Sequence, residues 1–386
     1  MVVTRCPDTR WAWVEIDHSA LRRNVKAYKS LLKGKTRMLC VVKADAYGHG
    51  AVSCARTMRN AGADAFAVAT VDEGVELREA GIAEPIVILS QPPAKSVRTI
   101  VEYRLEPAVY DADFALALGE AAVSRGTVAR YHFAIDTGMT RIGVPWNEAR
   151  EARRVFDFHR GLECAGTFTH FATADVPNDW DWELAYKHFS EAVASIRDAG
   201  MSVGIVHCDN TPGTVLHPNA HRDMVRVGIG LYGLQPARVC ERYLPLDPVM
   251  SVRARLTRVA EPPVGSGVSY GLTWRVPKDG VQVGTVPIGY ADGLSRTLSG
   301  RMDVLVDGQR LHQVGRICMD QFMIASDMRP LLSRPAQPEL HEGDVVTVIG
   351  RDGDEEISMD EMAELRGTIN YEVACNFGMR LDKINC

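Results

Sequence analysis

Two kinds of hydrophobic pattern divide the chain. From about residue 17 to residue 233, short apolar runs alternate with segments whose apolar residues recur at helical spacing, such as Asp17–Leu32, Asp72–Ala80 and Trp182–Ala199. The runs are continuous, which is typical of strands buried on both faces of a parallel sheet. They are Met38–Val42, Ala65–Val71, Pro85–Leu89, Leu105–Tyr110, Tyr131–Ile135, Cys164–Thr169, Gly204–Cys208 and Met224–Ile229.

Eight such runs alternating with helices predict an α/β fold, a (β/α)8 TIM barrel. A doubly wound open sheet remains the alternative, because periodicity does not reveal whether a sheet closes on itself. We favour the barrel.

The pattern of apolar and polar residues changes after about Pro245. Residues 249–259 alternate apolar with polar side chains, as a half-exposed strand does. An Asp307-Gly308 turn signal separates two further strand-like runs, residues 344–349 read as another strand, and Ser358–Arg366 is the clearest helix. We therefore predict a barrel domain, residues 12–245, followed by a mostly antiparallel β C-terminal domain, residues 246–386.

Composition excludes several classes of protein. The 386 residues are 46% hydrophobic and 24% charged, with a net charge of −5, so we expect a globular protein that binds neither nucleic acid nor an anionic membrane. No apolar run approaches the roughly 18 residues that span a bilayer. The first seven residues lack the features of a secretory signal, and the nine cysteines are scattered, so we expect a reduced, cytoplasmic protein.

A lysine stands where the first predicted barrel strand ends. The strand runs into Val42 and Lys43, and the polar loop 44–50 follows. In a (β/α)8 barrel, functional residues lie at the carboxyl ends of the strands and in the loops after them. An amine in that position suits Schiff-base chemistry. The alternative is a solvated lysine at a strand end.

The eighth predicted strand carries Arg226 inside an apolar run. A buried guanidinium is costly unless it is paired or bound, so Arg226 belongs either to a ligand site or to an ion pair within the barrel. Barrels often build a phosphate site from the loops after strands 7 and 8, and Thr211, Gly228 and Ile229 could supply its donors. A lysine for an imine, an arginine for a ring and a phosphate site together indicate pyridoxal 5′-phosphate.

Other constellations are weaker. The glycines of 228–233 match a dinucleotide-binding spacing, but the residues after them do not read as the helix which that motif requires. His217 and His221 have the spacing of a helical metal pair, yet Pro218 makes a helix through them doubtful. We expect no metal site.

The chain resembles the alanine racemases, a family of fold-type III pyridoxal phosphate enzymes, over nearly its whole length and in order. The motif that contains the cofactor lysine matches at residues 42–50. The other matching motifs are residues 136–143, 170–175, 226–233, 268–271, 288–293, 315–320 and 369–372.

The resemblance implies roles for individual residues. Lys43 would bind the cofactor and act as one catalytic base, and Tyr270 would be the second base, reaching the active site of the partner subunit in a head-to-tail homodimer. Arg141 and Met319 would bind the carboxylate of the amino-acid substrate. His170 would link Arg226 to Tyr270. The implied cofactor-binding set is Lys43, Tyr47, His170, Asn210, Thr211, Arg226, Gly228, Ile229 and Tyr371.

The implied activity is the interconversion of L-alanine and D-alanine, which supplies D-alanine for peptidoglycan. A racemase of serine or another amino acid, a decarboxylase of the same fold and a non-catalytic cofactor carrier remain alternatives. The chain departs from the family at Ala134, where a lysine usually stands. That lysine is often carbamylated and orients the arginine at position 141, so we expect a chloride ion or another carboxylate to replace it.

Overall fold

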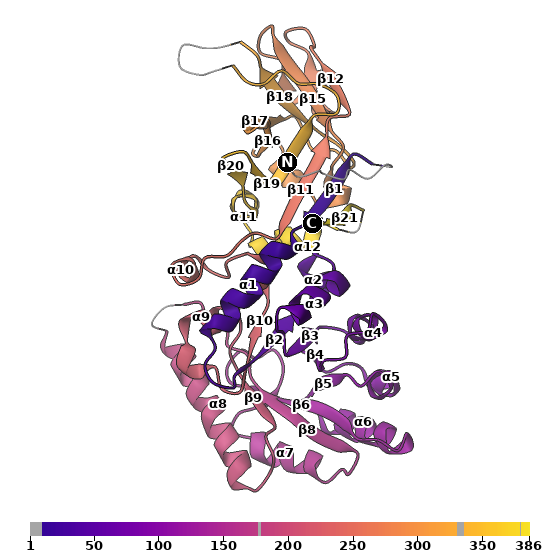
Figure 1. The fold of residues 1–386 in the computed structure, drawn as a ribbon, viewed down its shortest axis with the longest axis vertical. Coiled ribbons are helices and arrows are strands. Elements are labelled where there is room, and N and C mark those ends of the chain that lie inside the picture. The colour runs from indigo at the N-terminus through magenta and orange to yellow at the C-terminus, as the bar shows by residue number, and fades with distance from the viewer. Residues whose placement is uncertain (1–9, 177–178, 330–335, 379) are drawn as a thin grey trace. The chain divides into compact units, whose positions relative to one another are not determined.

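The computed structural model describes residues 10–176, 179–329, 336–378 and 380–386. These residues form two compact units (Figure 1). The first unit holds residues 20–46 and 50–247, and the second unit holds residues 10–19, 47–49 and 248–386. This division differs from the sequence-based limits, 12–245 and 246–386, at residues 12–19, 47–49 and 246–247. The segment in which we saw no secretory signal lies outside the described residues. Among the described helices, none has the length and apolar character needed to cross a membrane.

The first unit contains a sheet of parallel strands in the order β10-β2-β3-β4-β5-β6-β8-β9, with β7 (Val144–Pro145) beside β6. Backbone hydrogen bonds from Asp223 N to Val206 O (3.0 Å) and from Arg226 N to Asp209 O (2.9 Å) join the two end strands. The sheet therefore closes into a barrel, as predicted. Its strands are β2 (Arg37–Val41), β3 (Ala65–Val68), β4 (Ile86–Ile88), β5 (Glu106–Val109), β6 (Ala129–Asp136), β8 (Leu162–Phe168), β9 (Ile205–His207) and β10 (Met224–Val227).

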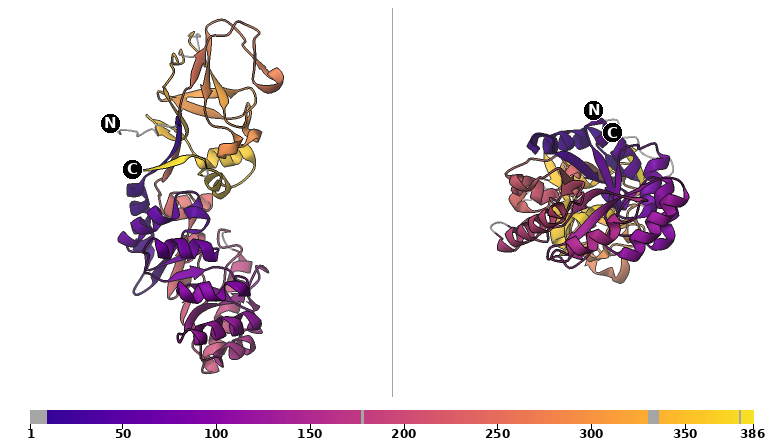
Figure 2. Two further views of the ribbon diagram at one scale, coloured as in Figure 1. Left: turned by 90° about the vertical axis from the view of Figure 1, so that its right-hand side faces the viewer. Right: turned by 90° about the horizontal axis from the view of Figure 1, so that it is seen from below.

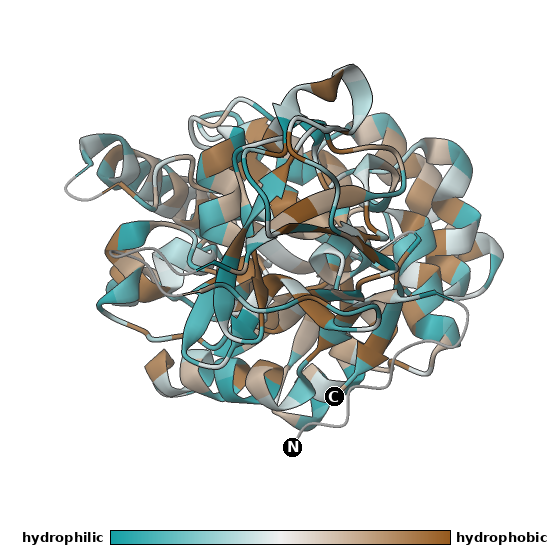
Figure 3. Ribbon diagram, turned by 90° about the horizontal axis from the view of Figure 1, so that it is seen from above, coloured by the Kyte–Doolittle hydropathy of each residue, from teal (hydrophilic) through white to brown (hydrophobic). Residues whose placement is uncertain are grey.

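Helices surround these strands (Figure 2). The first begins as the sequence predicts, because the Asp17 carboxylate accepts a hydrogen bond from the Ser19 N–H (2.7 Å) and caps it. Hydrophobic residues concentrate on the inner strands and polar residues on the outer turns (Figure 3). The helices are α1 (His18–Leu31), α3 (Ala51–Asn60), α4 (Val71–Glu79), α5 (Val97–Glu102), α6 (Ala112–Ser124), α7 (Ala149–Asp157), α8 (Trp180–Asp198), α9 (Thr211–Leu216) and α10 (Arg238–Glu241).

The second unit is built on a mostly antiparallel sheet in the order β12-β15-β18-β17-β16-β19-β11-β1-β21, with β20 beside β19. The pair β13–β14 stands apart from it. Residues 250, 252 and 254 of β11 are buried and their neighbours are not, as the alternating sequence predicts. The strands are β1 (Ala12–Ile16), β11 (Met250–Arg255), β12 (Arg258–Ala260), β13 (Gly267–Val268), β14 (Trp274–Arg275), β15 (Val281–Val286), β16 (Asp303–Val306), β17 (Gln309–Val314), β18 (Phe322–Asp327), β19 (Val345–Asp352), β20 (Glu355–Ile357) and β21 (Asp382–Asn385).

Local signals in this unit were read correctly in part. Asp307 and Gly308 both have positive φ, 48° and 70°, and join β16 to β17 in a hairpin. Ser358 caps α11 (Met359–Arg366). We did not foresee α12 (Asn370–Asn376) or the placement of β1 in this sheet, where it pairs antiparallel with β11 and parallel with β21.

Candidate active site

Lys43 follows the carboxyl end of β2 and opens a single turn, α2 (Lys43–Tyr47). The next four residues have φ between 52° and 54°, so this turn is left-handed. L-residues other than glycine adopt that conformation at a cost of roughly 1–2 kcal/mol each. Such strain persists only where the surroundings enforce it, and it gathers at functional sites. The lysine thus stands beside a run of four consecutive non-glycine residues with positive φ.

Two carboxylates hold this loop. Glu73 accepts hydrogen bonds from the Ala44 N–H (2.6 Å) and the Ala69 N–H (2.7 Å), and Asp45 accepts one from the Ala51 N–H (2.7 Å). The bond from Ala44 ties the turn to α4, and the bond from Ala51 ties it to the start of α3. The backbone around Lys43 is therefore fixed before any ligand binds.

Arg226 is almost fully buried at the end of the barrel where the strands terminate. Its Nη1 donates to His207 Nδ1 (3.1 Å), and its Nη2 donates to the carbonyls of Thr169 (2.8 Å) and Cys208 (2.9 Å) and to His170 Nδ1 (3.1 Å). Burial lowers the pKa of Arg226 to about 10, so the guanidinium remains charged at neutral pH. No ion pair to Arg226 occurs among the described residues.

His170 lies among cations. Burial, and then the charges of Arg226, Arg141 and Lys43, hold the pKa of His170 well below its usual value. The imidazole is therefore neutral. Because its Nδ1 accepts from Arg226, its proton must sit on Nε2, which can donate to a further group. The first unit thus brings four of the predicted residues together.

The predicted phosphate donors also meet in the first unit. The Thr211 hydroxyl accepts a hydrogen bond from the Gly228 N–H (2.8 Å) and keeps its own hydrogen to donate. Asn210 caps α9, since its side chain accepts from the Gly213 N–H. Ile229 begins a single 3-10 turn, residues 229–232, and its N–H has no backbone acceptor among the described residues. No dinucleotide-type helix follows.

Ala134 sits in an apolar environment. It packs with Ala108 and Phe168, and a cavity of only about 10 Å³ separates this cluster from Arg141. That volume barely reaches the size of one water molecule. Arg141 forms no ion pair within the described part of the chain, and none of the carboxylates described there takes the place of the family's lysine.

In the second unit, Tyr47 contacts Tyr371 edge to face, with 6.1 Å between ring centroids. Burial, and then the nearby Tyr371, raises the pKa of Tyr47, so its phenol stays protonated and can donate. These two predicted cofactor residues come from distant parts of the sequence. The structure places them side by side.

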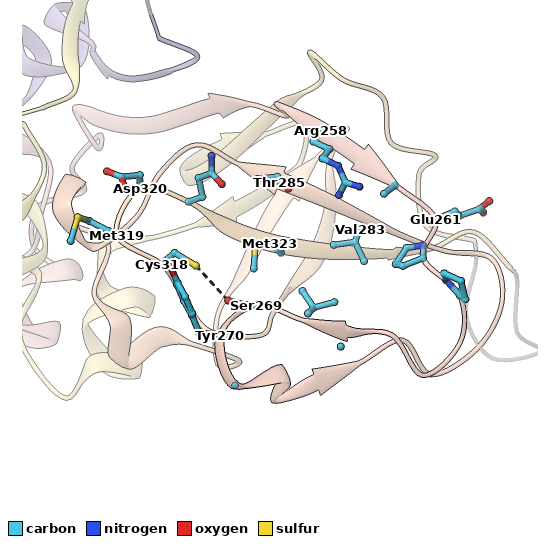
Figure 4. A pocket seen from close by; sticks show the side chains of 17 residues that line it. Arg258, Glu261, Ser269, Tyr270, Val283, Thr285, Cys318, Met319, Asp320 and Met323 are labelled. Atoms are coloured by element: carbon cyan, nitrogen blue, oxygen red, sulfur yellow. Dashed lines mark hydrogen bonds between the residues drawn. The ribbon is translucent and has the colours of Figure 1, made fainter.

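Tyr270 and Met319 line an open groove of about 1080 Å³ in the second unit (Figure 4). Their exposed fractions are 69% and 52%, which is high for such large side chains. Ser269 has φ 63°, and its hydroxyl donates to the Arg316 carbonyl (2.6 Å) and lies 3.4 Å from Cys318 Sγ. The backbone that carries Tyr270 is therefore anchored while its ring is open to solvent.

The backbone around Met319 needs a glycine next to it. The Met319 carbonyl accepts from the Ala291 N–H (3.0 Å), and a Cβ on Gly289 would lie 2.2 Å from that carbonyl oxygen. The Met319 N–H has no backbone acceptor among the described residues. It is thus available for an anionic group.

The histidines with metal-like spacing point to different partners. His217 stacks on Trp182 with 3.6 Å between ring centroids, and its Nε2 lies 3.2 Å from a backbone carbonyl. His221 Nε2 lies 2.9 Å from the Thr214 carbonyl, and residues 218–220 form a 3-10 turn between the two. Across the described residues, no cluster of three or more metal-ligating side chains is found.

Asp209, to which sequence analysis gave no role, is fully buried at the end of β9. Neither of its carboxylate oxygens has a hydrogen-bond partner among the residues that the structure describes. Burial raises the pKa of Asp209 to about 7, against the opposing charges of Arg226 and Arg222. The unfolded chain gives up this proton near pH 4 and the folded protein near pH 7, so stability should fall as pH rises between those values.

Replacing Asp209 by asparagine should remove that fall. We expect Asp209→Asn to gain stability relative to the parent by on the order of 3 kcal/mol as pH rises from 4 to 7. Urea unfolding at several pH values measures it, with the exposed Asp113→Asn as control. An unchanged pH slope in Asp209→Asn would contradict the prediction.

Comparisons with known proteins cover both units. Two family models match, the alanine racemase N-terminal domain over residues 16–236 and the alanine racemase C-terminal domain over residues 249–385. An alanine racemase of Nostoc sp. is 40% identical over 98% of both chains, and one of Synechocystis sp. is 42% identical over 97% of this chain and 98% of the relative. A solved alanine racemase from Bacillus anthracis with bound L-Ala-P has a TM-score of 0.90 at 34% identity, covering 98% of this chain and 96% of that chain.

Proposed function

The chain belongs to the alanine racemase family, and on that premise we propose that it interconverts L-alanine and D-alanine with pyridoxal 5′-phosphate as cofactor. The observation that carries the proposal is the buried Arg226 guanidinium, held by His207 and His170 in the unit whose strand β2 is followed by Lys43. We further propose that the enzyme works in the cytoplasm and supplies D-alanine for peptidoglycan.

The residues present fit this cofactor. Lys43 would bind its aldehyde carbon, and Arg226 would donate to its ring nitrogen. Donors for the phosphate would come from the Thr211 hydroxyl and the Ile229 N–H, and Tyr47, Asn210, Gly228 and Tyr371 are the further residues that we propose for cofactor binding. When bound, the cofactor withdraws electrons from the substrate and so acidifies the hydrogen on its α-carbon.

Arg226 would set the strength of that electron withdrawal. A guanidinium donates hydrogen bonds and does not release its proton. Arg226 would therefore hold the ring nitrogen without protonating it, which limits how far negative charge moves away from the α-carbon. A returning proton then adds at that carbon rather than elsewhere.

Two bases on opposite faces of the substrate would move the proton. Lys43 would remove it from one face, and Tyr270 of the partner subunit would return one to the other. A phenol is mostly protonated at neutral pH and needs a donor to stabilise its anion. Neutral His170, with its Nε2 proton free to donate, fits that role.

We also propose that the active form is a homodimer. The exposure of Tyr270 and Met319 in an open groove supports it, because both would complete a neighbour's site. We expect activity to coincide with dimer molar mass in light scattering after size exclusion. A fully active monomer would contradict the shared site.

The substrate is proposed to be small, since Met319, Tyr290 and Tyr371 would restrict the space beside the α-carbon. Arg141 and the Met319 N–H would bind its carboxylate. Incubating the purified protein and cofactor with each L-amino acid, followed by chiral chromatography, tests the proposal. We expect D-alanine as the main product, whereas D-serine in excess, or no D-amino acid, would overturn it.

A further inference from the structure

Four buried polar side chains form a continuous chain through the interior of the barrel. Glu106 Oε2 lies 3.0 Å from His132 Nε2, His132 Nδ1 lies 2.8 Å from His207 Nε2, and His207 Nδ1 lies 3.1 Å from Arg226 Nη1. All four residues are at most 5% exposed. We call these four residues the Glu106–Arg226 chain.

Chemistry allows this chain only one direction. Arg226 can only donate, so His207 Nδ1 must accept and the His207 proton must sit on Nε2. That proton is donated to His132 Nδ1, which places the His132 proton on Nε2, facing the Glu106 carboxylate. If His132 were a charged imidazolium, its Nδ1 would carry a hydrogen and His207 Nε2 would have to accept it. The proton of His207 would then sit on Nδ1, where it would face the N–H of Arg226. Both rings are therefore neutral.

The carboxylate end is fixed as an acceptor. Burial alone would raise the pKa of Glu106, but the hydrogen bond from His132 and the charges of Arg130 and Arg78 together hold it below its usual value. Arg130 Nη1 lies 3.0 Å from Glu106 Oε1. Glu106 also lines a cavity of about 330 Å³ together with Arg78, Arg104 and Arg130. It is therefore ionised at neutral pH.

A glycine makes the chain possible. Strand β8 lies between β6, which carries His132, and β9, which carries His207. On β8, Gly166 pairs with His132, and a Cβ at Gly166 would lie 2.5 Å from His132 Nδ1. Phe168, two residues further on, stacks on His207 with 5.1 Å between ring centroids. The middle strand thus leaves space for the contact between the histidines and clamps one of them.

We propose that Glu106 and His132 are positioning residues for the racemase reaction. They hold His207 in the tautomer that accepts from Arg226, and so they aim the guanidinium at the cofactor's ring nitrogen. The inference rests on the proposed function, because it assigns Arg226 to that nitrogen. It extends the site from the barrel mouth to the opposite side of the barrel core.

The tautomers give a test that needs no turnover. In full-length protein labelled with ¹⁵N-histidine, ring nitrogen shifts distinguish a protonated from an unprotonated nitrogen. We expect His132 and His207 both to carry their proton on Nε2 at neutral pH. A proton on Nδ1 of His207 would overturn the inference, whatever the fate of the proposed function.

Two matched variants of Glu106 separate the role of its hydrogen-bond acceptor from the role of its side-chain volume. Glu106→Gln keeps an acceptor for His132, whereas Glu106→Leu removes it at similar size. We expect His132 and His207 to keep their tautomers in the Gln variant and to lose them in the Leu variant. In the Leu variant, kcat and the affinity for pyridoxal 5′-phosphate should each fall by about tenfold. The KM for alanine should stay within about twofold, because the proposed carboxylate ligands are untouched.

A purely structural role is the rival explanation. Thr167 is on the same strand as Gly166, and its buried hydroxyl donates to the Val203 carbonyl (2.8 Å). Thr167→Val removes that hydroxyl and leaves the Glu106–Arg226 chain intact. We expect it to lower stability without changing the tautomers or cofactor affinity. If Glu106→Leu behaves like Thr167→Val in all these readouts, the positioning role is wrong. Trapping of Lys43 by borohydride in the parent protein tests the proposed function separately.

Discussion

Replacing Tyr270 by alanine will lower racemisation by about a thousandfold while the protein still binds pyridoxal 5′-phosphate with its normal visible absorbance. The proposed second base is lost, but the groups that would hold the cofactor are not, apart from any contact Tyr270 itself makes. Chiral chromatography of both reaction directions and an absorbance spectrum measure the two halves of this result. The substitution is at an exposed position and should not disturb folding.

Tyr243→Ala is the matched control, since Tyr243 is also exposed (52%) and lies outside the proposed site. It should retain normal activity. If Tyr270→Ala interconverts both enantiomers at the parent rate, the two-base assignment is wrong. The fall in kcat/KM must be the same in both directions, because the equilibrium constant of racemisation is fixed, and this equality checks the measurement.

The second large effect is expected at Lys43. Lys43→Ala should lower activity by about ten-thousandfold or more, because one amine serves both as the anchor of the cofactor and as a base. In the parent, borohydride reduction followed by peptide mapping should attach the cofactor to residue 43. The exposed Lys35→Ala is the control and should behave as the parent does. A label on any other lysine would sink the assignment.

The two inactive variants can be mixed to test the shared site. In a dimer with sites completed across the interface, a Lys43→Ala subunit paired with a Tyr270→Ala subunit has one site with both bases intact. After exchange, half of the dimers are mixed, so activity should recover to about a quarter of the parent's. If each subunit builds its site alone, mixing restores nothing.

The barrel could be predicted because its strands are buried on both faces. Such strands read as continuous apolar runs, and all eight are present. The hairpin at Asp307 and the helix after Ser358 were also predictable, because their signals are local. The strand β1 was missed because its short segment pairs only with strands far along the chain, β11 and β21.

For the candidate site too, the sequence indicated only those features that have a local signal. Lys43, Arg226 and Thr211 were proposed from residue type and strand position, and the other site residues were proposed from family motifs. The left-handed turn could not be predicted, because Lys-Ala-Asp-Ala-Tyr is equally compatible with a right-handed helix. The backbone N–H of Ala44 donates to Glu73, which is distant in the sequence, and no local signal marks that contact. Glu106 stood at the start of an apolar run, and nothing local distinguished it from a surface residue.

The position of β1 has a consequence for synthesis. A ribosome delivers Ala12–Ile16 first, but its neighbours β11 and β21 emerge only after the barrel sequence is complete. Until then, the strand has unpaired backbone groups and an apolar face that can associate with other nascent chains. We therefore expect folding of the nascent chain to depend on chaperones that cover β1. A pause in translation ahead of β11 would lengthen the time for which β1 is exposed.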